Sequence, residues 1–317
     1  MEAAVDDIRM SRFLATIRRD VPIDLDREAL AVTAPDEAEL RKIFDELEFR
    51  SLADKILNKS ENKPKQVNIQ LDLFAENPSD GAELSKNASK NSVDTTPHNY
   101  ELIENEEQAK KLCDFLLTSK KVSVDAETTS TDAIDAELVG LSFSVEPHKA
   151  FYVAVPAERE KAQTIVNIFK PLYENPEILK IGQNIKYDME VLMRYGVTLA
   201  APMFDTMLAH YVLHPEQRHG MDYLADVLLD YHTITIDSLI GPKGKGQKSM
   251  RDVPPADVCP YAAEDADITL QLYNVLEPQL HDAGAWELFT EIETPLVPVL
   301  ADMETTGVRI DTKTLAD

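Results

Sequence analysis

The chain has 317 residues, which is enough for two domains, and its apolar content of 44% is ordinary for a soluble globular protein. No apolar run is long enough to cross a membrane, so we expect no membrane partner. With 32 basic and 57 acidic residues the formal charge is −25, which argues against a protein that coats duplex DNA. The charge argues less strongly against an enzyme that gathers carboxylates to bind a metal.

The first residues and the cysteines indicate a cytoplasmic protein. The stretch from Met1 to Asp7 lacks the basic and apolar regions of a signal peptide. Cys113 and Cys259 form no metal-binding pattern and suit a reducing compartment, with at most one buried thiol each.

The first 97 residues divide into a helical segment and a polar linker. Residues 1–58 read as helical, with Asp36 and Glu39 spaced as a capping box before apolar residues at helical intervals. Residues 59–97 are rich in turn and disorder residues and predict a flexible linker. An apolar island at 66–74 interrupts this linker.

Residues 98–284 alternate strand and helix patterns, which predicts an α/β domain. Asn105 can cap a helix, and three successive strand patterns after it suggest an antiparallel meander. A covering helix and a further strand that ends just before Asn184 come next. The apolar positions that carry these expectations are Ala109, Leu112, Cys113 and Leu116, then Leu141, Phe143 and Val145, then Phe151, Val153 and Val155, then Ala162, Ile165, Val166, Phe169 and Leu172, and last Ile178, Leu179 and Ile181.

Two carboxylates stand out on the first of these strands. Asp125 and Glu127 are two residues apart in a period-two pattern, so both side chains project from the same face. Adjacent carboxylates repel unless a proton or a cation lies between them, and Lys121 at the strand start is too distant to pair with Asp125. The pattern favours a divalent-metal site, although an isolated Asp-x-Glu is more often just two exposed acids at a strand end.

Two later motifs strengthen the hypothesis of a divalent-metal site. Asn184 and Asp188 are four residues apart at the start of a predicted helix. Tyr261 and Asp265 are also four apart, so on a helix they share one face. Each motif alone is more often structural than catalytic, but their combination in this order is specific.

The three motifs together resemble the exonuclease motifs of the bacterial DNA polymerase I family, and so do the neighbouring stretches 138–143, 204–208 and 264–272. The resemblance implies a ribonuclease H-like fold, with a mixed sheet flanked by helices. It also implies a 3′–5′ proofreading exonuclease that acts on single-stranded or frayed DNA 3′ ends with two Mg²⁺ or Mn²⁺ ions. Two such ions can activate a water and stabilise the leaving 3′ oxygen.

The resemblance assigns a role to each matching carboxylate and to one tyrosine. Asp125 would bridge both ions, and Glu127 and Asp265 would complete the tighter site. Asp188 would reach the second ion through water, and the Tyr261 hydroxyl would hold the attacking water.

Three further positions would contact the nucleic acid. By the family pattern, Asn184 and Tyr187 would touch the terminal nucleotides. Thr131 stands where the family commonly has an apolar residue that wedges between the last two bases. Base wedging is therefore expected to be weaker here, or to be done by another side chain.

Three acidic residues and one pair of histidines lie outside this expected site. Asp205 reads as a helix N-cap. His210 and His214 have metal-pair spacing but lack a third ligand in their segment, so we do not expect zinc there. Glu264 and Asp267 flank Asp265 but would point elsewhere on the helix.

The resemblance also suggests what the ends of the chain are. Residues 1–58 look like the last helices of a 5′-nuclease domain, and residues 285–317 look like the truncated start of a polymerase domain. The catalytic residues of neither domain are included, so we expect neither activity. Two alternatives to DNA proofreading remain: an RNA-trimming relative, and a catalytically silent scaffold.

The linker island carries a second resemblance. Gln70, Leu71, Asp72, Leu73 and Phe74 are similar to the pentapeptide by which bacterial replication proteins dock on the sliding clamp. The alternative is a strand, because Val67, Ile69, Leu71 and Leu73 alternate and could pack on the α/β domain.

Overall fold

The computed structural model describes residues 5–17, 36–46, 91–244, 246–312 and 314. The chain divides into two compact units, residues 1–87 and 88–317. The first contains helices α1 (Val5–Ala15) and α2 (Glu37–Glu46). Asp36 begins α2 as expected, because its Oδ1 accepts hydrogen bonds from the amides of Ala38 and Glu39 at 3.1 Å each. The pentapeptide at 70–74 lies outside the described residues.

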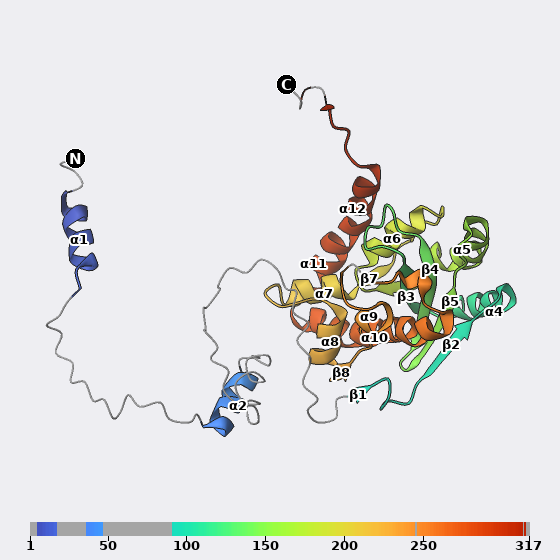
Figure 1. The fold of residues 1–317 in the computed structure, drawn as a ribbon, viewed down its shortest axis with the longest axis horizontal. Coiled ribbons are helices and arrows are strands. Elements are labelled where there is room, and N and C mark those ends of the chain that lie inside the picture. Colours follow the sequence, from blue (N-terminus) through green and yellow to red (C-terminus); the bar gives the residue numbers. More distant parts are fainter. Residues whose placement is uncertain (1–4, 18–35, 47–90, 245, 313, 315–317) are drawn as a thin grey trace. The chain divides into compact units, whose positions relative to one another are not determined.

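The second unit is built on a six-stranded mixed sheet with the order β2-β5-β4-β3-β6-β7 (Figure 1). The pairs β3–β4 and β4–β5 are antiparallel, which confirms the predicted meander, while β2–β5, β3–β6 and β6–β7 are parallel. The strands are β2 (Asn99–Ile103), β3 (Lys121–Thr128), β4 (Leu138–Glu146), β5 (Lys149–Ala154), β6 (Leu179–Gly182) and β7 (Met203–Asp205).

Two helices, α4 (Glu106–Leu116) and α5 (Arg159–Tyr173), supply apolar side chains to one core cluster of the sheet. Asn105 caps α4 as predicted by accepting from the Gln108 amide at 3.0 Å. The buried residues of α4 and the predicted apolar positions of α5 match the sequence patterns. These helices pack on the face of β3 that carries Val122 and Val124.

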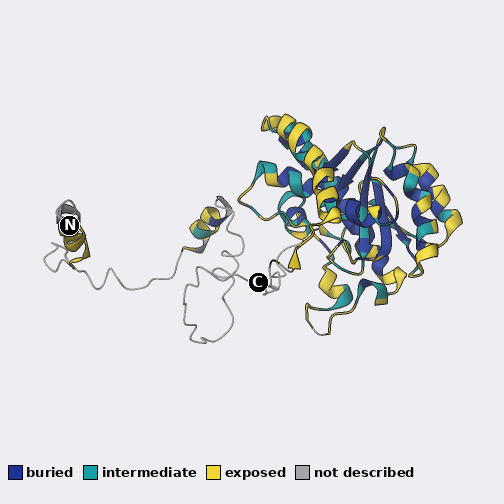
Figure 2. Cartoon of the chain, turned by 90° about the horizontal axis from the view of Figure 1, so that it is seen from above, coloured by how far each residue is buried: buried dark blue, intermediate teal, exposed yellow. Residues whose placement is uncertain are grey.

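The long helix α10 (Pro255–Asp282) contacts five strands of the sheet, from β2 to β6. Helices α7 (Thr206–Leu213) and α8 (Met221–Leu228) pack beside α10 and share a buried cluster with it. The sheet therefore lies between helical layers, and Figure 2 shows its residues as the buried centre of the unit. This arrangement is the mixed sheet flanked by helices that the family resemblance implied.

Shorter elements complete this unit. Helix α6 (Ile185–Met193) follows β6, and strand β8 (Tyr231–His232) pairs in parallel with β1 (Asn91–Ser92). The sequence assigned β1 to the flexible linker, so part of that segment pairs with the folded unit. The remaining elements are α9 (Ile236–Ile240), the 3₁₀ turn η2 (Met250–Asp252), α11 (Trp286–Leu288), the π-helical segment η3 (Phe289–Glu293) and α12 (Thr294–Thr306).

The last helix packs into the same core. Val297 and Ala301 of α12 are buried in the cluster that contains α4 and α5, and Phe289 is buried beside α10. The division at residue 284 between an exonuclease and a polymerase segment stays a prediction. Within the described ranges, no helix is both long and apolar enough to span a bilayer.

Candidate active site

Three carboxylates from two distant parts of the chain meet beside the sheet. One oxygen each of Asp125, Glu127 and Asp265 can be chosen so that all lie within 4.8 Å of one another. Asp125 and Glu127 project from the same face of β3, and Asp265 comes from α10, which crosses that face. Glu127 and Asp265 are buried, whereas Asp125 keeps partial contact with solvent.

The pairing of β3 with β4 fixes the two strand carboxylates. Asp125 lies opposite Ser142, whose hydroxyl donates to Asp125 Oδ2 at 3.3 Å, and Glu127 lies opposite Gly140. A Cβ atom at Gly140 would overlap the ring of Tyr152 on β5. Glycine is therefore needed there, because Tyr152 fills the space beside the strand that carries Glu127.

Burial raises the pKa of every carboxyl group in the cluster. It raises the pKa of Asp125 to about 6, against the opposing effect of the Ser142 hydrogen bond. The pKa values of Glu127 and Asp265 rise well above their usual range through burial and then through the charge of Asp125. Mg²⁺ and Mn²⁺ prefer oxygen ligands, which carboxylates supply. A bound cation would also offset the negative charge that is unfavourable in this buried group. These residues therefore fit a divalent metal.

Asp188 lies close to the cluster without joining the group of three. It is buried in the first turn of α6, and its pKa is raised well above the usual range, first by burial and next by the charge of Asp125. Asp188 therefore lies near enough to Asp125 for the two charges to interact. Its expected contact with a second ion stays a prediction.

Asp205 holds the start of the helix that carries Asp188. It caps α7 as predicted, accepting from the Leu208 amide at 3.1 Å. It also accepts from the amides of Asn184 at 3.2 Å and Ile185 at 2.9 Å, at the start of α6. Asn184 there adopts a left-handed conformation with φ of 60°. Spacing along the chain gives no sign of this second role, which depends on β6 and β7 being neighbours.

Tyr261 lies one turn before Asp265 on α10, as expected. Burial and then the charge of the nearby Asp265 raise the pKa of Tyr261. The tyrosine therefore stays protonated and keeps a hydroxyl proton to donate at neutral pH.

Of the three residues expected to contact nucleic acid, Tyr187 and Thr131 lie around the end of β3, and Asn184 immediately precedes α6. The Tyr187 hydroxyl is 2.5 Å from Thr128 Oγ1 and donates to the carbonyl of Ser130. Thr131 is exposed on the following loop, and Asn184 is partly exposed. Tyr187 thus also contacts the loop after the metal-site strand, a role that the sequence did not predict.

The two acids that flank Asp265 on α10 have structural partners. Glu264 accepts from the Tyr231 hydroxyl at 2.8 Å, and Asp267 accepts from the Tyr100 hydroxyl at 2.8 Å, so both point away from the acid cluster, as predicted.

His210 of α7 contacts His219, which lies beyond the helix, a pair that the sequence did not indicate. The buried ring of His210 lies 2.8 Å (Nδ1 to Nδ1) from that of His219, and its centroid is 5.1 Å from that of His214. In the described part of the chain, the three carboxylates Asp125, Glu127 and Asp265 are the only group of potential metal ligands that meet.

Comparison with known proteins identifies the family. A family model described as 3′–5′ exonuclease matches residues 100–281, which is more than half of the chain. The chain belongs to the 3′–5′ exonuclease family. Within this family it is similar to bacterial DNA polymerase I, as the sequence motifs predicted. It is 32% identical to DNA polymerase I of Pseudomonas aeruginosa over 96% of this chain, and 32% identical to that of Chloroflexus aurantiacus over 98%.

The chain covers 32% and 34% of those two polymerases, so it spans about a third of their length. Among solved structures, Brucella melitensis NrnC matches with a TM-score of 0.52 and 22% identity, over 68% of this chain and 99% of NrnC. Escherichia coli RNase D, an exoribonuclease, matches with a TM-score of 0.51 and 16% identity, over 65% of this chain and 51% of RNase D. These structures confirm the ribonuclease H-like exonuclease fold.

Proposed function

We propose that this chain is the 3′–5′ proofreading exonuclease part of a cytoplasmic DNA polymerase I and removes nucleotides from single-stranded or frayed DNA 3′ ends. The observation that carries the proposal is the approach of Asp125, Glu127 and Asp265 to within 4.8 Å inside a 3′–5′ exonuclease fold. The proposed cofactor is a pair of Mg²⁺ or Mn²⁺ ions held by these residues and Asp188. Such ions, when bound, supply an activated water and charge stabilisation for the leaving 3′ oxygen.

The chain's own residues would bind and orient the reactants. Tyr261 keeps its proton because of burial and the charge of Asp265, so its hydroxyl can hold a water molecule beside that carboxylate. The Asp205 contacts fix the turn that carries Asn184 and Tyr187, which would then meet the terminal nucleotides at a defined place. Fixed geometry of this kind lowers the entropy that the reaction must lose.

The direct test uses a single-stranded DNA oligonucleotide labelled at its 5′ end. With Mn²⁺, the purified chain should shorten it stepwise from the 3′ end and release mononucleotides, and Asp125→Ala should abolish this. Equal digestion in excess chelator would contradict a metal-dependent reaction.

DNA is favoured over RNA as the substrate because the similarity to DNA polymerase I extends over 96% of the chain. An RNA-trimming enzyme is the alternative, since RNase D shares the fold. Matched DNA and RNA oligonucleotides of one sequence should give a higher kcat/KM for DNA, and a clear preference for RNA would reverse the assignment.

We also propose that the pentapeptide at 70–74 docks on a bacterial sliding clamp. Leu73 and Phe74 would be the apolar anchors, and Gln70 would supply directed hydrogen bonds. A peptide that orders on binding should have modest affinity, roughly micromolar, and tethering would raise the local concentration at the DNA end. A peptide of residues 66–77 should bind the clamp, and replacing Leu73 and Phe74 by Ala should abolish binding; failure of the unmodified peptide to bind would refute this.

A further inference from the structure

The loop between β3 and β4, residues 129–137, begins two residues after Glu127. Its two ends are tied together, because the Thr129 amide donates to the Glu137 carbonyl and the Glu137 amide donates to Thr129 Oγ1, both at 3.0 Å. A loop closed at its base in this way is held directly at the end of the strand that carries Asp125 and Glu127.

The loop is folded on itself around Asp132. The carbonyl of Asp132 accepts from the amides of Asp135 and Ala136, and its Oδ1 accepts from the Ile134 amide at 3.0 Å. Ala133 and Ala136 are buried in the core, whereas Thr131 is exposed and Ile134 is 60% exposed. The inner side of the loop is therefore anchored, and its tip presents a hydroxyl and a large apolar side chain.

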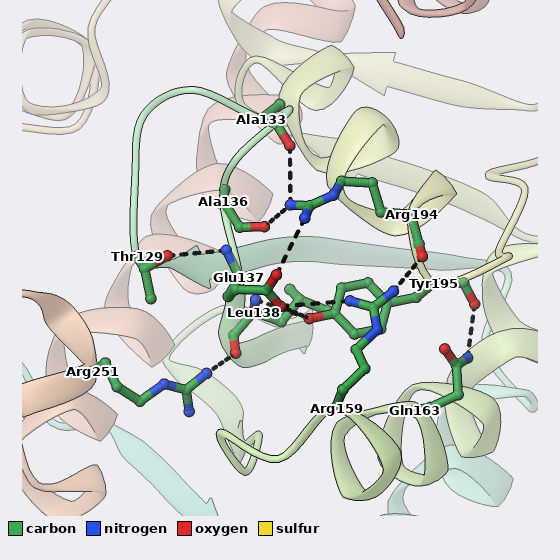
Figure 3. A network of polar contacts seen from close by, with 10 residues as sticks. All are labelled: Thr129, Ala133, Ala136, Glu137, Leu138, Arg159, Gln163, Arg194, Tyr195 and Arg251. Carbon is green, nitrogen blue, oxygen red and sulfur yellow. Dashed lines mark hydrogen bonds and ion pairs between the residues drawn. The ribbon is translucent and has the colours of Figure 1, made fainter.

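Arg194, which directly follows the last turn of α6, binds backbone carbonyl groups of this loop (Figure 3). Its guanidinium donates to the carbonyls of Ala133 and Ala136 and pairs with Glu137 Oε1 at 3.2 Å. A charged donor on carbonyls at the end of a helical turn is a stabilising arrangement.

Glu137 joins the loop to two further side chains. Its Oε2 accepts from the Tyr195 hydroxyl at 3.1 Å and pairs with Arg159 at 3.5 Å, while the Arg159 guanidinium lies 3.5 Å from the centroid of the Tyr195 ring (Figure 3). One carboxylate thus links the loop to α5 and to the end of α6.

Helix α6 therefore holds the loop from both of its ends. Tyr187 in its first turn contacts Thr128 and Ser130, and Arg194 after its last turn contacts the far side of the loop. The same helix carries Asp188. The loop, the end of the strand that carries Asp125 and Glu127, and the helix of Asp188 thus form one connected group.

We propose that Arg194 and Glu137 are positioning residues that hold loop 129–137 so that Ile134, on the same loop as the expected contact Thr131, also contacts the 3′-terminal nucleotide. This inference rests on the proposed function. In a chain with formal charge −25, general attraction for phosphate is weak, so contacts with the sugar and base must supply much of the affinity. A hydroxyl and an exposed apolar side chain beside the site are suited to those contacts.

The test compares Arg194→Met with Lys170→Met. Lys170 is a matched control because its Nζ donates to the carbonyl of Gly196, 2.6 Å away in the segment after α6, and does not reach the loop. For a single-stranded DNA oligonucleotide with Mn²⁺, Arg194→Met should raise KM about tenfold or more, since displacing a contact by about 1 Å can cost up to about 10². Lys170→Met should leave KM within about twofold of the unmodified chain.

Ile134→Ser is the second variant, in case Arg194→Met fails to fold. Ile134 is exposed, so its replacement should leave the melting temperature unchanged and still raise KM. A structural role for the loop alone predicts the opposite pattern, with lower melting temperature for Arg194→Met and unchanged KM for both variants.

A binding measurement without metal separates this inference from the proposed function. Fluorescence anisotropy in chelator should show weaker oligonucleotide binding by Arg194→Met and Ile134→Ser than by Lys170→Met. Equal binding and equal KM across the three variants would overturn the inference while leaving the exonuclease assignment in place. An unmodified chain that does not cleave DNA with Mn²⁺ would instead refute the proposed function.

Discussion

At the scale of single residues, the site is arranged for a ligand rather than for stability. Asp125, Glu127 and Asp265 have raised pKa values because each loses hydration, and the charge of Asp125 adds to the rise at Glu127 and Asp265. Their mutual repulsion costs folding free energy when no cation is bound. The stability of the chain and its activity should therefore respond in opposite ways to the loss of one carboxylate.

We expect Asp125→Ala to abolish cleavage and, in chelator, to cost little stability or to raise it, because it removes one repelling charge. Mn²⁺ should raise the melting temperature of the unmodified chain by mass action and raise that of Asp125→Ala less. Thermal melts with chelator and with Mn²⁺ test both statements. A large loss of stability in metal-free Asp125→Ala would indicate a structural role.

The pH dependence of stability should follow from the raised pKa of Asp125. The folded state binds this proton up to about pH 6, whereas the unfolded state releases it near pH 4, so metal-free stability should fall as pH rises through this window. The amide in Asp125→Asn cannot ionise. Over this pH window the free energy of unfolding of the variant should therefore fall by on the order of 2 kcal/mol less than that of the unmodified chain. Urea unfolding of both proteins in chelator between pH 4 and 7 measures the difference, and parallel curves would contradict it.

Lys180 on β6 should have the reverse effect at alkaline pH. Its side chain is buried, its Nζ donates to the Asn175 carbonyl at 2.7 Å, and burial lowers its pKa to about 8. Between about pH 8 and 10.5 the unfolded state binds more protons, so this residue should make stability rise with pH. Over this range the free energy of unfolding of the unmodified chain should rise by on the order of 2 kcal/mol relative to that of Lys180→Met. Urea unfolding of both proteins at pH 8 and pH 10 tests this, with tyrosine ionisation common to both, and a constant difference would refute it.

At the scale of elements, local patterns predicted much of the fold. The Asn105 cap, the meander and the helix face of Tyr261 and Asp265 depend on short-range spacing, which a sequence displays directly. Features that depend on distant neighbours were missed: the edge strand β2, the contacts of Asp205 with α6, and the His210–His219 pair. Spacing within one segment does not reveal which segments become neighbours.

Gly140 allows strands β4 and β5 to pack closely, so its replacement should reduce stability. Gly140→Ala should destabilise the chain by about 1–3 kcal/mol, because the added methyl group overlaps the Tyr152 ring between β4 and β5. Gly246→Ala is the control, since a Cβ there meets nothing within 4 Å. Urea unfolding of both variants measures the difference, and equal stability would show that Tyr152 moves without cost.

At the scale of the whole molecule, α12 is part of the same core as the sheet. Val297 is 7% exposed in that core, whereas Val299 on the same helix is 51% exposed. Val297→Ala should therefore lower the free energy of unfolding by about 1.5 kcal/mol, from two lost carbon atoms, and Val299→Ala should change it by less than about 0.5 kcal/mol. Equal effects would indicate that α12 does not unfold together with the sheet.

The length of α10 has a further consequence for how the molecule opens. This helix contacts strands β2 to β6 and helices α7 and α8, and it carries both Tyr261 and Asp265. Its middle cannot fray without separating the sheet from one helical layer, so amide protons at 262–272 should exchange with solvent only through global unfolding. Heat inactivation and loss of the fold should then be a single event, with no intermediate that retains the sheet but has lost the acid cluster.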